Sequence, residues 1–266
     1  HYPLRRQRQM CIRDRVKRKV FDALDIARKD SANIVCFPEL SFAKEWIEEI
    51  KKRYRNVMIV CGSFYDDSNR NVCKIILDGA EYDYAKCYPS IFEEEDGTGM
   101  RCGDRIFVFQ TKWGRIAVLN CIDFDKEYVT VASQDLDLVV NIRYDLDSEH
   151  GFQRRADICV DRPDGSRSST FMLQVNAKRI EYDDSVGGEG TVIIGYEHKY
   201  RLARYKQDGL RPKDDVRYKI YQARREMLLM ADLNISETTR RRTKTGNWYI
   251  YDTGSWKKLK DKRIWP

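Results

Sequence analysis

The stretch Gly114–Asp125 reads GRIAVLNCIDFD, and it decides how the rest of the chain is interpreted. Its first part, up to Leu119, is apolar almost throughout, which is typical of a strand buried on both faces beneath helices. Cys121 follows where such a strand ends and the chain must turn, so its side chain can leave the core and meet a ligand. Among the eight cysteines of the sequence, Cys121 is the one whose position asks for a chemical explanation.

Two further polar residues also stand where apolar runs end, Glu39 after ANIVCF and Pro38, and Lys86 after YDYA. A thiol becomes a strong nucleophile once it is deprotonated, and it needs a base or a nearby cation to reach that state. Glu39 can accept the proton, and Lys86 can favour the thiolate and stabilise an oxyanion. Each residue alone also has a structural explanation, as a helix-capping Glu, a solvated Lys and a core Cys.

The hydrophobic periodicity predicts buried strands, intervening helices and hairpins without internal repeats. This mixture favours a layered α/β domain. Helices are expected at 16–29, 43–54, 150–160 and 216–227, and an acidic loop at 93–99. Strands are expected at 32–37, 57–61, 71–77, 82–86, 105–110, 115–119, 136–142, 171–176, 191–194 and 228–235.

Composition restricts the class of protein. The 266 residues are 42% apolar and 34% charged, as in a globular protein with a substantial core, and they suffice for one large domain or two small ones. No apolar run approaches the roughly 20 residues that span a bilayer, and no secretory signal is present, so we expect a cytosolic protein without membrane contact. No two cysteines are three positions apart, which excludes the usual zinc-site spacing. Cys36 and Cys61 lie in strand-like runs and are expected to be buried thiols.

The net charge of +7 is concentrated at the two ends of the chain. Residues 1–15 carry five arginines and one aspartate, and residues 236–266 carry nine basic and three acidic residues, which leaves the remainder mildly acidic. Met10–Arg15 reads MCIRDR, the translation of a sequencing-library adapter. We therefore expect 1–15 to be read-through from a metagenomic fragment, with the native gene truncated upstream of about Val16.

Three separated segments in the same order resemble the nitrilase, or carbon–nitrogen hydrolase, superfamily. ANIVCFPELSF is similar to the segment that bears the catalytic Glu, YAKCYPSIFEEE to the Lys segment, and GRIAVLNCIDFD to the Cys segment. The resemblance extends over about Val16–Ile235 and implies a hydrolase domain at 16–239. It also implies an α/β fold arranged as a four-layer α-β-β-α sandwich, here lacking its first strand.

The resemblance implies hydrolysis of a non-peptide carbon–nitrogen bond through a thioester, with no metal and no organic cofactor. Cys121 is then the nucleophile, Glu39 the general base and Lys86 the cation that stabilises the oxyanion. The family's second Glu falls on Glu94 by spacing, with Glu93 and Glu95 as alternatives. The residues implied for substrate positioning are Glu94, Ile122 through its backbone N–H, and Asn141.

Two regions depart from the family pattern. Asp157–Ser169 is an insertion, and Tyr144–Gly151 differs from the usual small or aromatic residues. The resemblance implies that the insertion borders the substrate pocket, so the sequence predicts a small-molecule amide-type substrate without naming it. The resemblance further implies a homodimer or a higher homo-oligomer.

The basic, aromatic segment Arg240–Pro266 is interpreted as a C-terminal extension. Its alternating cations and aromatic rings could bind nucleic acid through phosphates and stacked bases. Packing on the body of the protein or across a subunit interface is the favoured interpretation. Two alternatives to an amidase are kept: a non-catalytic binding module, and the hydrolase domain of a larger protein, in either case with a tail that binds nucleic acid or a partner.

Overall fold

The computed structural model describes residues 2–95, 99–134, 136–144, 170–176, 190–195, 218–223, 228–231, 233, 248–252 and 255–258. The chain divides into two compact units, His1–Arg105 and Ile106–Pro266. Each unit contains its own sheet, and each is described by itself below. The predicted helix at 150–160, the insertion at 157–169 and both His150 and His198 lie outside the described residues.

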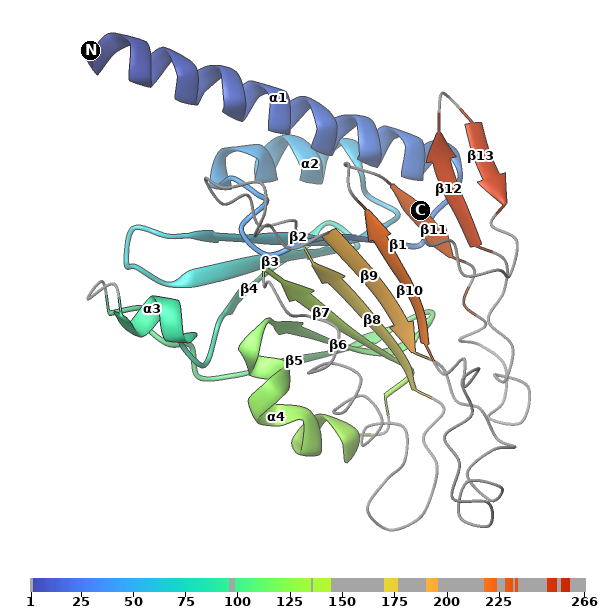
Figure 1. The fold of residues 1–266 in the computed structure, drawn as a ribbon. Coiled ribbons are helices and arrows are strands. Elements are labelled where there is room, and N and C mark those ends of the chain that lie inside the picture. The colour runs from blue at the N-terminus through green and yellow to red at the C-terminus, as the bar shows by residue number, and fades with distance from the viewer. Residues whose placement is uncertain are drawn as a thin grey trace, which may run out of the picture. The chain divides into compact units, whose positions relative to one another are not determined.

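The first unit is built on a four-stranded mixed sheet in the order β1-β2-β3-β4 (Figure 1). β1 runs parallel to β2, and the remaining neighbours are antiparallel. The predicted hairpin is confirmed, because β3 and β4 are joined at Asp78 and Gly79, which both have positive φ. The strands are β1 (Ile34–Phe37), β2 (Met58–Tyr65), β3 (Asn71–Leu77) and β4 (Ala80–Ala85).

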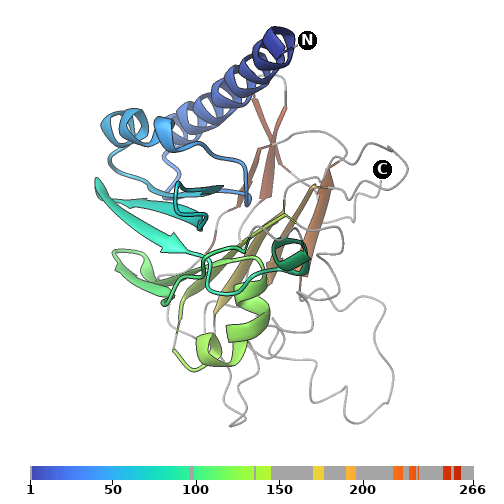
Figure 2. The same ribbon diagram turned by 90° about the vertical axis from the view of Figure 1, so that its left-hand side faces the viewer.

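Two helices cover one face of this sheet, α1 (Tyr2–Lys29) and α2 (Ile47–Arg53), with the short 3-10 turn η1 (Lys44–Trp46) before α2 (Figures 1 and 2). Both helices were predicted, although α1 begins well before Val16. Their apolar faces pack on alternate residues of the strands, as the helical and strand periodicities require. The buried residues shared by helices and sheet include Phe21, Leu24, Ile47, Ile50, Ile59, Cys61 and Ile76.

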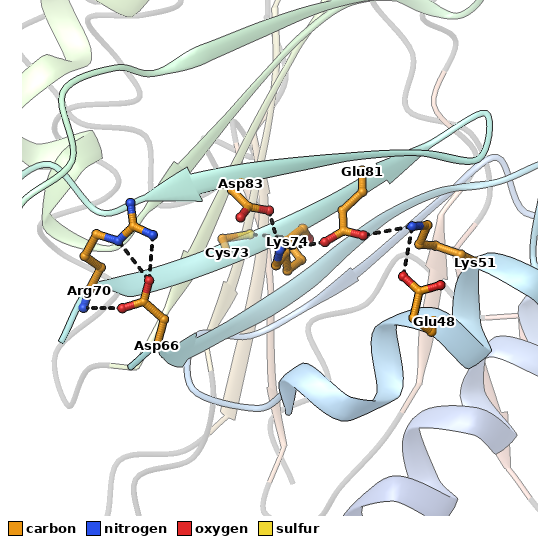
Figure 3. A network of polar contacts seen from close by, with 8 residues as sticks. All are labelled: Glu48, Lys51, Asp66, Arg70, Cys73, Lys74, Glu81 and Asp83. Atoms are coloured by element: carbon orange, nitrogen blue, oxygen red, sulfur yellow. Dashed lines mark hydrogen bonds and ion pairs between the residues drawn. The ribbon is translucent and has the colours of Figure 1, made fainter. Parts of the chain in front are cut away.

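A chain of ion pairs joins α2 to the β3–β4 hairpin (Figure 3). Lys51 of α2 pairs with Glu81 of β4 at 3.0 Å, and the other oxygen of Glu81 accepts a bond from Lys74 of β3 at 2.6 Å. Lys74 also pairs with Asp83. Each pair is partly accessible to solvent and therefore contributes little by itself, but together they fix the hairpin beneath the helix.

The second unit is built on a six-stranded mixed sheet in the order β10-β9-β8-β7-β6-β5. Its three central strands, β6, β7 and β8, are parallel and their outer neighbours are antiparallel. The buried strand predicted before Cys121 is confirmed, because β6 is buried throughout its apolar part. The helix α4 (Ile122–Ala132), which follows Cys121, was not predicted. The first four strands along the chain are β5 (Phe107–Thr111), β6 (Gly114–Asn120), β7 (Leu138–Arg143) and β8 (Phe171–Asn176).

The prediction of a helix at 216–227 was wrong. The segment contains β10 (Tyr218–Ala223), which pairs antiparallel with β9 (Gly190–Gly195) over its whole length. YKIYQA is rich in Tyr and Ile, which favour strands, and pairing along a sheet edge outweighs a weak helical pattern. The loop expected at 93–99 was also partly wrong, because it overlaps the short helix α3 (Ile91–Glu95).

Part of the C-terminal segment extends the closing strand of the second unit. β12 (Trp248–Asp252) pairs antiparallel with β11 (Leu229–Ala231), and β13 (Ser255–Lys258) pairs with β12. The backbone of this segment is therefore engaged in a small three-stranded sheet. The two larger mixed sheets with their helices confirm the predicted α/β class. No helix within the described ranges is long and apolar enough to cross a membrane.

Candidate active site

Glu39 lies in a tight turn directly after β1, and only 3% of it is exposed. The turn is fixed to the neighbouring strand β2, because the backbone N–H of Leu40 donates to the hydroxyl of Ser63 at 3.1 Å. Within the turn, the hydroxyl of Ser41 donates to the carbonyl of Pro38. Leu40 itself has a positive φ of 56°. The sequence thus places a carboxylate in the interior on a turn that is held at both ends.

Gly62 of β2 lies beneath this turn. Its φ is +56°, and a Cβ placed on it would lie 2.3 Å from the carbonyl oxygen of Pro38. Only glycine tolerates both the backbone conformation and the close approach. The turn that carries Glu39 therefore depends on Gly62.

We expect Gly62→Ala to destabilise the protein by about 3 kcal/mol or more, from the cost of a positive φ and from the clash with Pro38. Gly79→Ala is the matched control, because Gly79 has φ +80° but nothing lies within 4 Å of an added Cβ. The control should lose only about 1–2 kcal/mol. Urea unfolding of both variants measures the difference. Equal losses in the free energy of unfolding would show that the turn can move to accept the added methyl group of Gly62→Ala.

Lys86 follows β4 and is 1% exposed, so the interpretation of a solvated lysine does not hold. Its ammonium group donates to Oε1 of Glu39 at 2.9 Å and to Oε2 of Glu93 at 2.8 Å. Its backbone is also fixed, since its N–H donates to the carbonyl of Asn71 and its carbonyl accepts from Gly103. The structure therefore brings together two predicted residues that are far apart in the sequence, and holds the lysine charge between two carboxylates.

The second carboxylate beside Lys86 is Glu93 rather than Glu94. Spacing favoured Glu94, but its side chain is exposed, whereas Glu93 reaches back to Lys86. The reason is a capping box: Oε2 of Glu93 accepts the backbone N–H of Ser90 at 2.6 Å, at the start of α3. The pattern Ser90-Ile91-Phe92-Glu93 carries this signal in the sequence, and it would have identified Glu93.

Glu93 is held as an anion. Burial alone would raise its pKa, but the charge of Lys86 and the hydrogen bonds from Lys86, Tyr65 and the Ser90 backbone lower the pKa to about 2. Its unfolded value is near 4.5. Because the folded pKa is the lower one, this interaction stabilises the protein fully above about pH 4.5 and is lost as the pH falls towards 2.

We expect Glu93→Gln to destabilise the protein by about 2 kcal/mol at pH 7, which is less than the whole pKa shift implies because solvent screens a partly accessible carboxylate. The difference from the wild type should shrink as the pH is lowered from 4.5 to about 2. Glu94→Gln is the matched control and should change stability by less than about 0.5 kcal/mol. Urea unfolding at a series of pH values measures both, and a difference that stays constant with pH would contradict the charged role of Glu93.

Two further residues of this cluster were not predicted. Asn71 at the start of β3 donates from Nδ2 to Oε1 of Glu39 at 2.9 Å and to Oε1 of Glu93 at 3.2 Å. The hydroxyl of Tyr65 at the end of β2 donates to Oε1 of Glu93 at 2.6 Å. Neither residue carries a sequence signal, because strand register alone places them beside Lys86.

Cys121 belongs to the second unit and is 7% exposed. It stands between β6 and α4 with φ 54° and ψ −111°, an uncommon conformation for a residue other than glycine. Its backbone N–H donates to the carbonyl of Ile142 at 2.7 Å, and its carbonyl accepts from Phe124. The sharp turn places the sulfur at the N-terminus of an 11-residue helix, where the helix dipole stabilises negative charge.

Ile122 is the first residue of α4, and helix geometry leaves the N–H of a first residue without an acceptor inside the helix. The role of this N–H as a donor to a substrate oxygen stays a prediction. In the same helix turn, Asp125 pairs with Arg143 of β7 at 3.3 Å, and both side chains are largely buried. The arginine offsets an acidic charge that would otherwise disfavour a thiolate at the same helix end.

Asn141 lies on β7 between Leu119 of β6 and Gln174 of β8 in the register of the sheet. It is fully buried, and neither polar atom of its side chain has a hydrogen-bond partner among the described residues. An unsatisfied buried amide is unusual in a folded protein. The substrate-positioning role of Asn141 stays a prediction.

The other described cysteines differ from Cys121 in their setting. Burial raises the pKa of Cys61 and Cys73 well above the usual range, and that of Cys36 to about 12. The raised pKa values disfavour the thiolates of these three residues, of which Cys61 and Cys73 are buried and Cys36 is partly exposed, whereas Cys102 is exposed. Among the described residues, no group of three or more His, Cys, Asp and Glu side chains is placed to hold a metal ion.

Comparison with solved structures identifies the fold, which is that of the nitrilase, or carbon–nitrogen hydrolase, superfamily. Nit3 from Saccharomyces cerevisiae, a member of branch 10 of that superfamily, is similar with a TM-score of 0.53 at 14% identity, over 68% of this chain and 75% of that chain. No protein-family model matches the sequence, and no curated protein matches it by sequence.

Two other similar structures are an amidase and a synthetase. A variant of the amidase from Nesterenkonia sp. AN1, which carries the acetamide moiety of fluoroacetamide on its active-site cysteine, has a TM-score of 0.51 at 13% identity, over 69% of this chain and 76% of that chain. The glutamine-dependent NAD+ synthetase from Acinetobacter baumannii has a TM-score of 0.52 at 15% identity, over 68% of this chain. This chain spans only 38% of the length of the synthetase.

Proposed function

We propose that this protein is a cysteine-dependent amidase, which hydrolyses a small amide through a thioester on Cys121. Glu39 is the general base and acid, and Lys86 is the cation that stabilises the oxyanion. The observation that carries the proposal is the buried ion pair between Glu39 and Lys86 at 2.9 Å, with 4% of the Glu39 side chain and 1% of the Lys86 side chain exposed. Burying such charges costs free energy, so the ion pair is weak evidence for stability, which favours a chemical reason for its presence.

The first half of the reaction forms the thioester. Glu39 accepts the thiol proton of Cys121, and the sulfur attacks the amide carbonyl carbon, whose oxygen becomes an oxyanion. Lys86 and the N–H of Ile122 stabilise that oxygen. The carbon–nitrogen bond then breaks, and the leaving nitrogen takes the proton from Glu39 as ammonia or an amine departs.

The second half regenerates the enzyme. Glu39 removes a proton from a water molecule, the water oxygen attacks the thioester carbonyl, and the carbon–sulfur bond breaks. The sulfur recovers its proton, and a carboxylic acid leaves. The two carboxylates have separate roles, because Glu93 is already saturated by donors while Glu39 must exchange a proton during each half-reaction.

Ammonia release from a panel of short aliphatic amides tests the proposal. We expect turnover of at least one member by the wild type, and a loss on the order of 10²-fold or more in Glu39→Gln. Turnover by the Glu39→Gln variant equal to that of the wild type would overturn the assignment of the base. Failure of the wild type to hydrolyse any member, together with an unreactive Cys121, would favour the non-catalytic binding module.

A further inference from the structure

Asn71 is the residue that connects the two carboxylates. It is fully buried, and its Nδ2 donates to Oε1 of Glu39 at 2.9 Å and to Oε1 of Glu93 at 3.2 Å. Lys86 bridges the same two carboxylates from its ammonium group. Two acidic side chains are therefore held side by side by two shared donors, one charged and one neutral.

Strand register explains how this bridge is built. Asn71 pairs with Tyr65 across β2 and β3, and its carbonyl accepts the backbone N–H of Lys86 on its other side. Tyr65, Asn71 and Lys86 thus form one row across the end of the four-stranded sheet. From this row the Tyr65 hydroxyl donates to Glu93 at 2.6 Å, beside the bond from Asn71 to the same oxygen.

The charges of this cluster do not balance, and this gives the neutral donor a specific task. Two carboxylates face one ammonium group, so the two acids share a single charged donor. An amide N–H stabilises an ionised carboxylate by a smaller amount and adds no charge.

We propose that Asn71 and Tyr65 are positioning residues that divide the work of the two carboxylates. Tyr65 and Asn71 hold Glu93 as the counter-charge of Lys86, and Asn71 holds the carboxylate of Glu39 in place as the acceptor of the thiol proton. This inference rests on the proposed function. It predicts that loss of Asn71 changes the pH at which the site becomes active, which loss of a purely structural contact does not do.

The test is the rate of Cys121 alkylation by iodoacetamide, mapped by peptide mass spectrometry from pH 4 to 8. In the wild type, the rate should fall on the acidic side of the pH–rate profile, where the reactive thiolate is lost. Asn71→Ala removes one hydrogen-bond donor from the carboxylate of Glu39. The midpoint of the acidic fall in the pH–rate profile of Cys121 alkylation should therefore move up by about one pH unit. Asn71→Ser keeps a smaller donor and should give an intermediate shift.

Tyr65→Phe should lower the rate several-fold without moving the acidic midpoint, because Glu93, with a pKa of about 2, stays ionised over this range. The variant also keeps the test decisive if the Asn71 variants fail to fold, since 42% of Tyr65 is exposed and its ring is retained. The matched control is Tyr82→Phe on β4, which should match the wild type.

The outcomes separate the two proposals. A uniform loss of rate at every pH in the Asn71 variants, or an unchanged rate in Tyr65→Phe, would overturn the positioning roles while leaving the amidase proposal in place. A pH–rate profile whose acidic midpoint moves as expected in the Asn71 variants supports the positioning roles. If wild-type Cys121 reacts no faster than the exposed Cys102, the proposed function itself is wrong.

Discussion

Cys121→Ala is expected to abolish amide hydrolysis, with a loss on the order of 10³-fold or more, because no thioester can form without the sulfur. The fold should survive, since alanine is smaller than cysteine and has the same difficulty with the positive φ at this position. Ammonia release and circular dichroism on the same preparation measure the two effects.

Cys102→Ala is the matched control, because Cys102 is an exposed cysteine of the first unit. Its activity should equal that of the wild type. Hydrolysis that persists in Cys121→Ala and disappears in Cys102→Ala would show that our proposal assigns the nucleophile to the wrong residue.

Lys86→Met is expected to cost about 3–5 kcal/mol of stability as well as the activity, because it leaves Glu39 and Glu93 buried without their counter-charge. The loss should become smaller at acidic pH, where protonation removes the uncompensated charge. Adding Glu93→Gln to Lys86→Met should restore part of the stability at pH 7. Urea unfolding of the single and double variants measures these differences.

Lys74→Met supplies the control for this prediction. Lys74 also lies between two carboxylates, Glu81 and Asp83 (Figure 3), but 53% of the Asp83 side chain is exposed. Water can therefore replace the lost partner, and the cost should be about 1 kcal/mol or less. A loss of stability in Lys86→Met no larger than that in Lys74→Met would contradict the burial of Glu39 and Lys86 that the structure shows.

Much of the fold could be predicted because buried strands leave a strong signal. The apolar runs before Glu39 and Cys121 predicted buried strands, and both are strands in the structure. β6 is buried throughout its apolar part, whereas in β1 only Val35 is buried. The helix expected at 216–227 shows the limit of this reasoning. Edge pairing with β9, which lies far away in the sequence, decided the conformation of β10.

The site was predictable where residues stand at strand ends and unpredictable where long-range register decides. Glu39 and Lys86 were singled out because each follows a strand, and the structure brings their side chains together. Spacing favoured Glu94 and kept Glu93 only as an alternative, although the Ser90–Glu93 capping pattern points to Glu93. Asn71 could not be found, since only the register of three strands shows that its side chain lies between two carboxylates.

The central claim is that Cys121 is an activated nucleophile served by Glu39 and Lys86. The most direct test is brief alkylation of the native protein with iodoacetamide near neutral pH, with the rate at each cysteine mapped by mass spectrometry. We predict that Cys121, although only 7% exposed, reacts faster than the exposed Cys102, and that Glu39→Gln and Lys86→Met both slow it. A Cys121 that reacts no faster than Cys102, at a rate that neither variant changes, would contradict the claim.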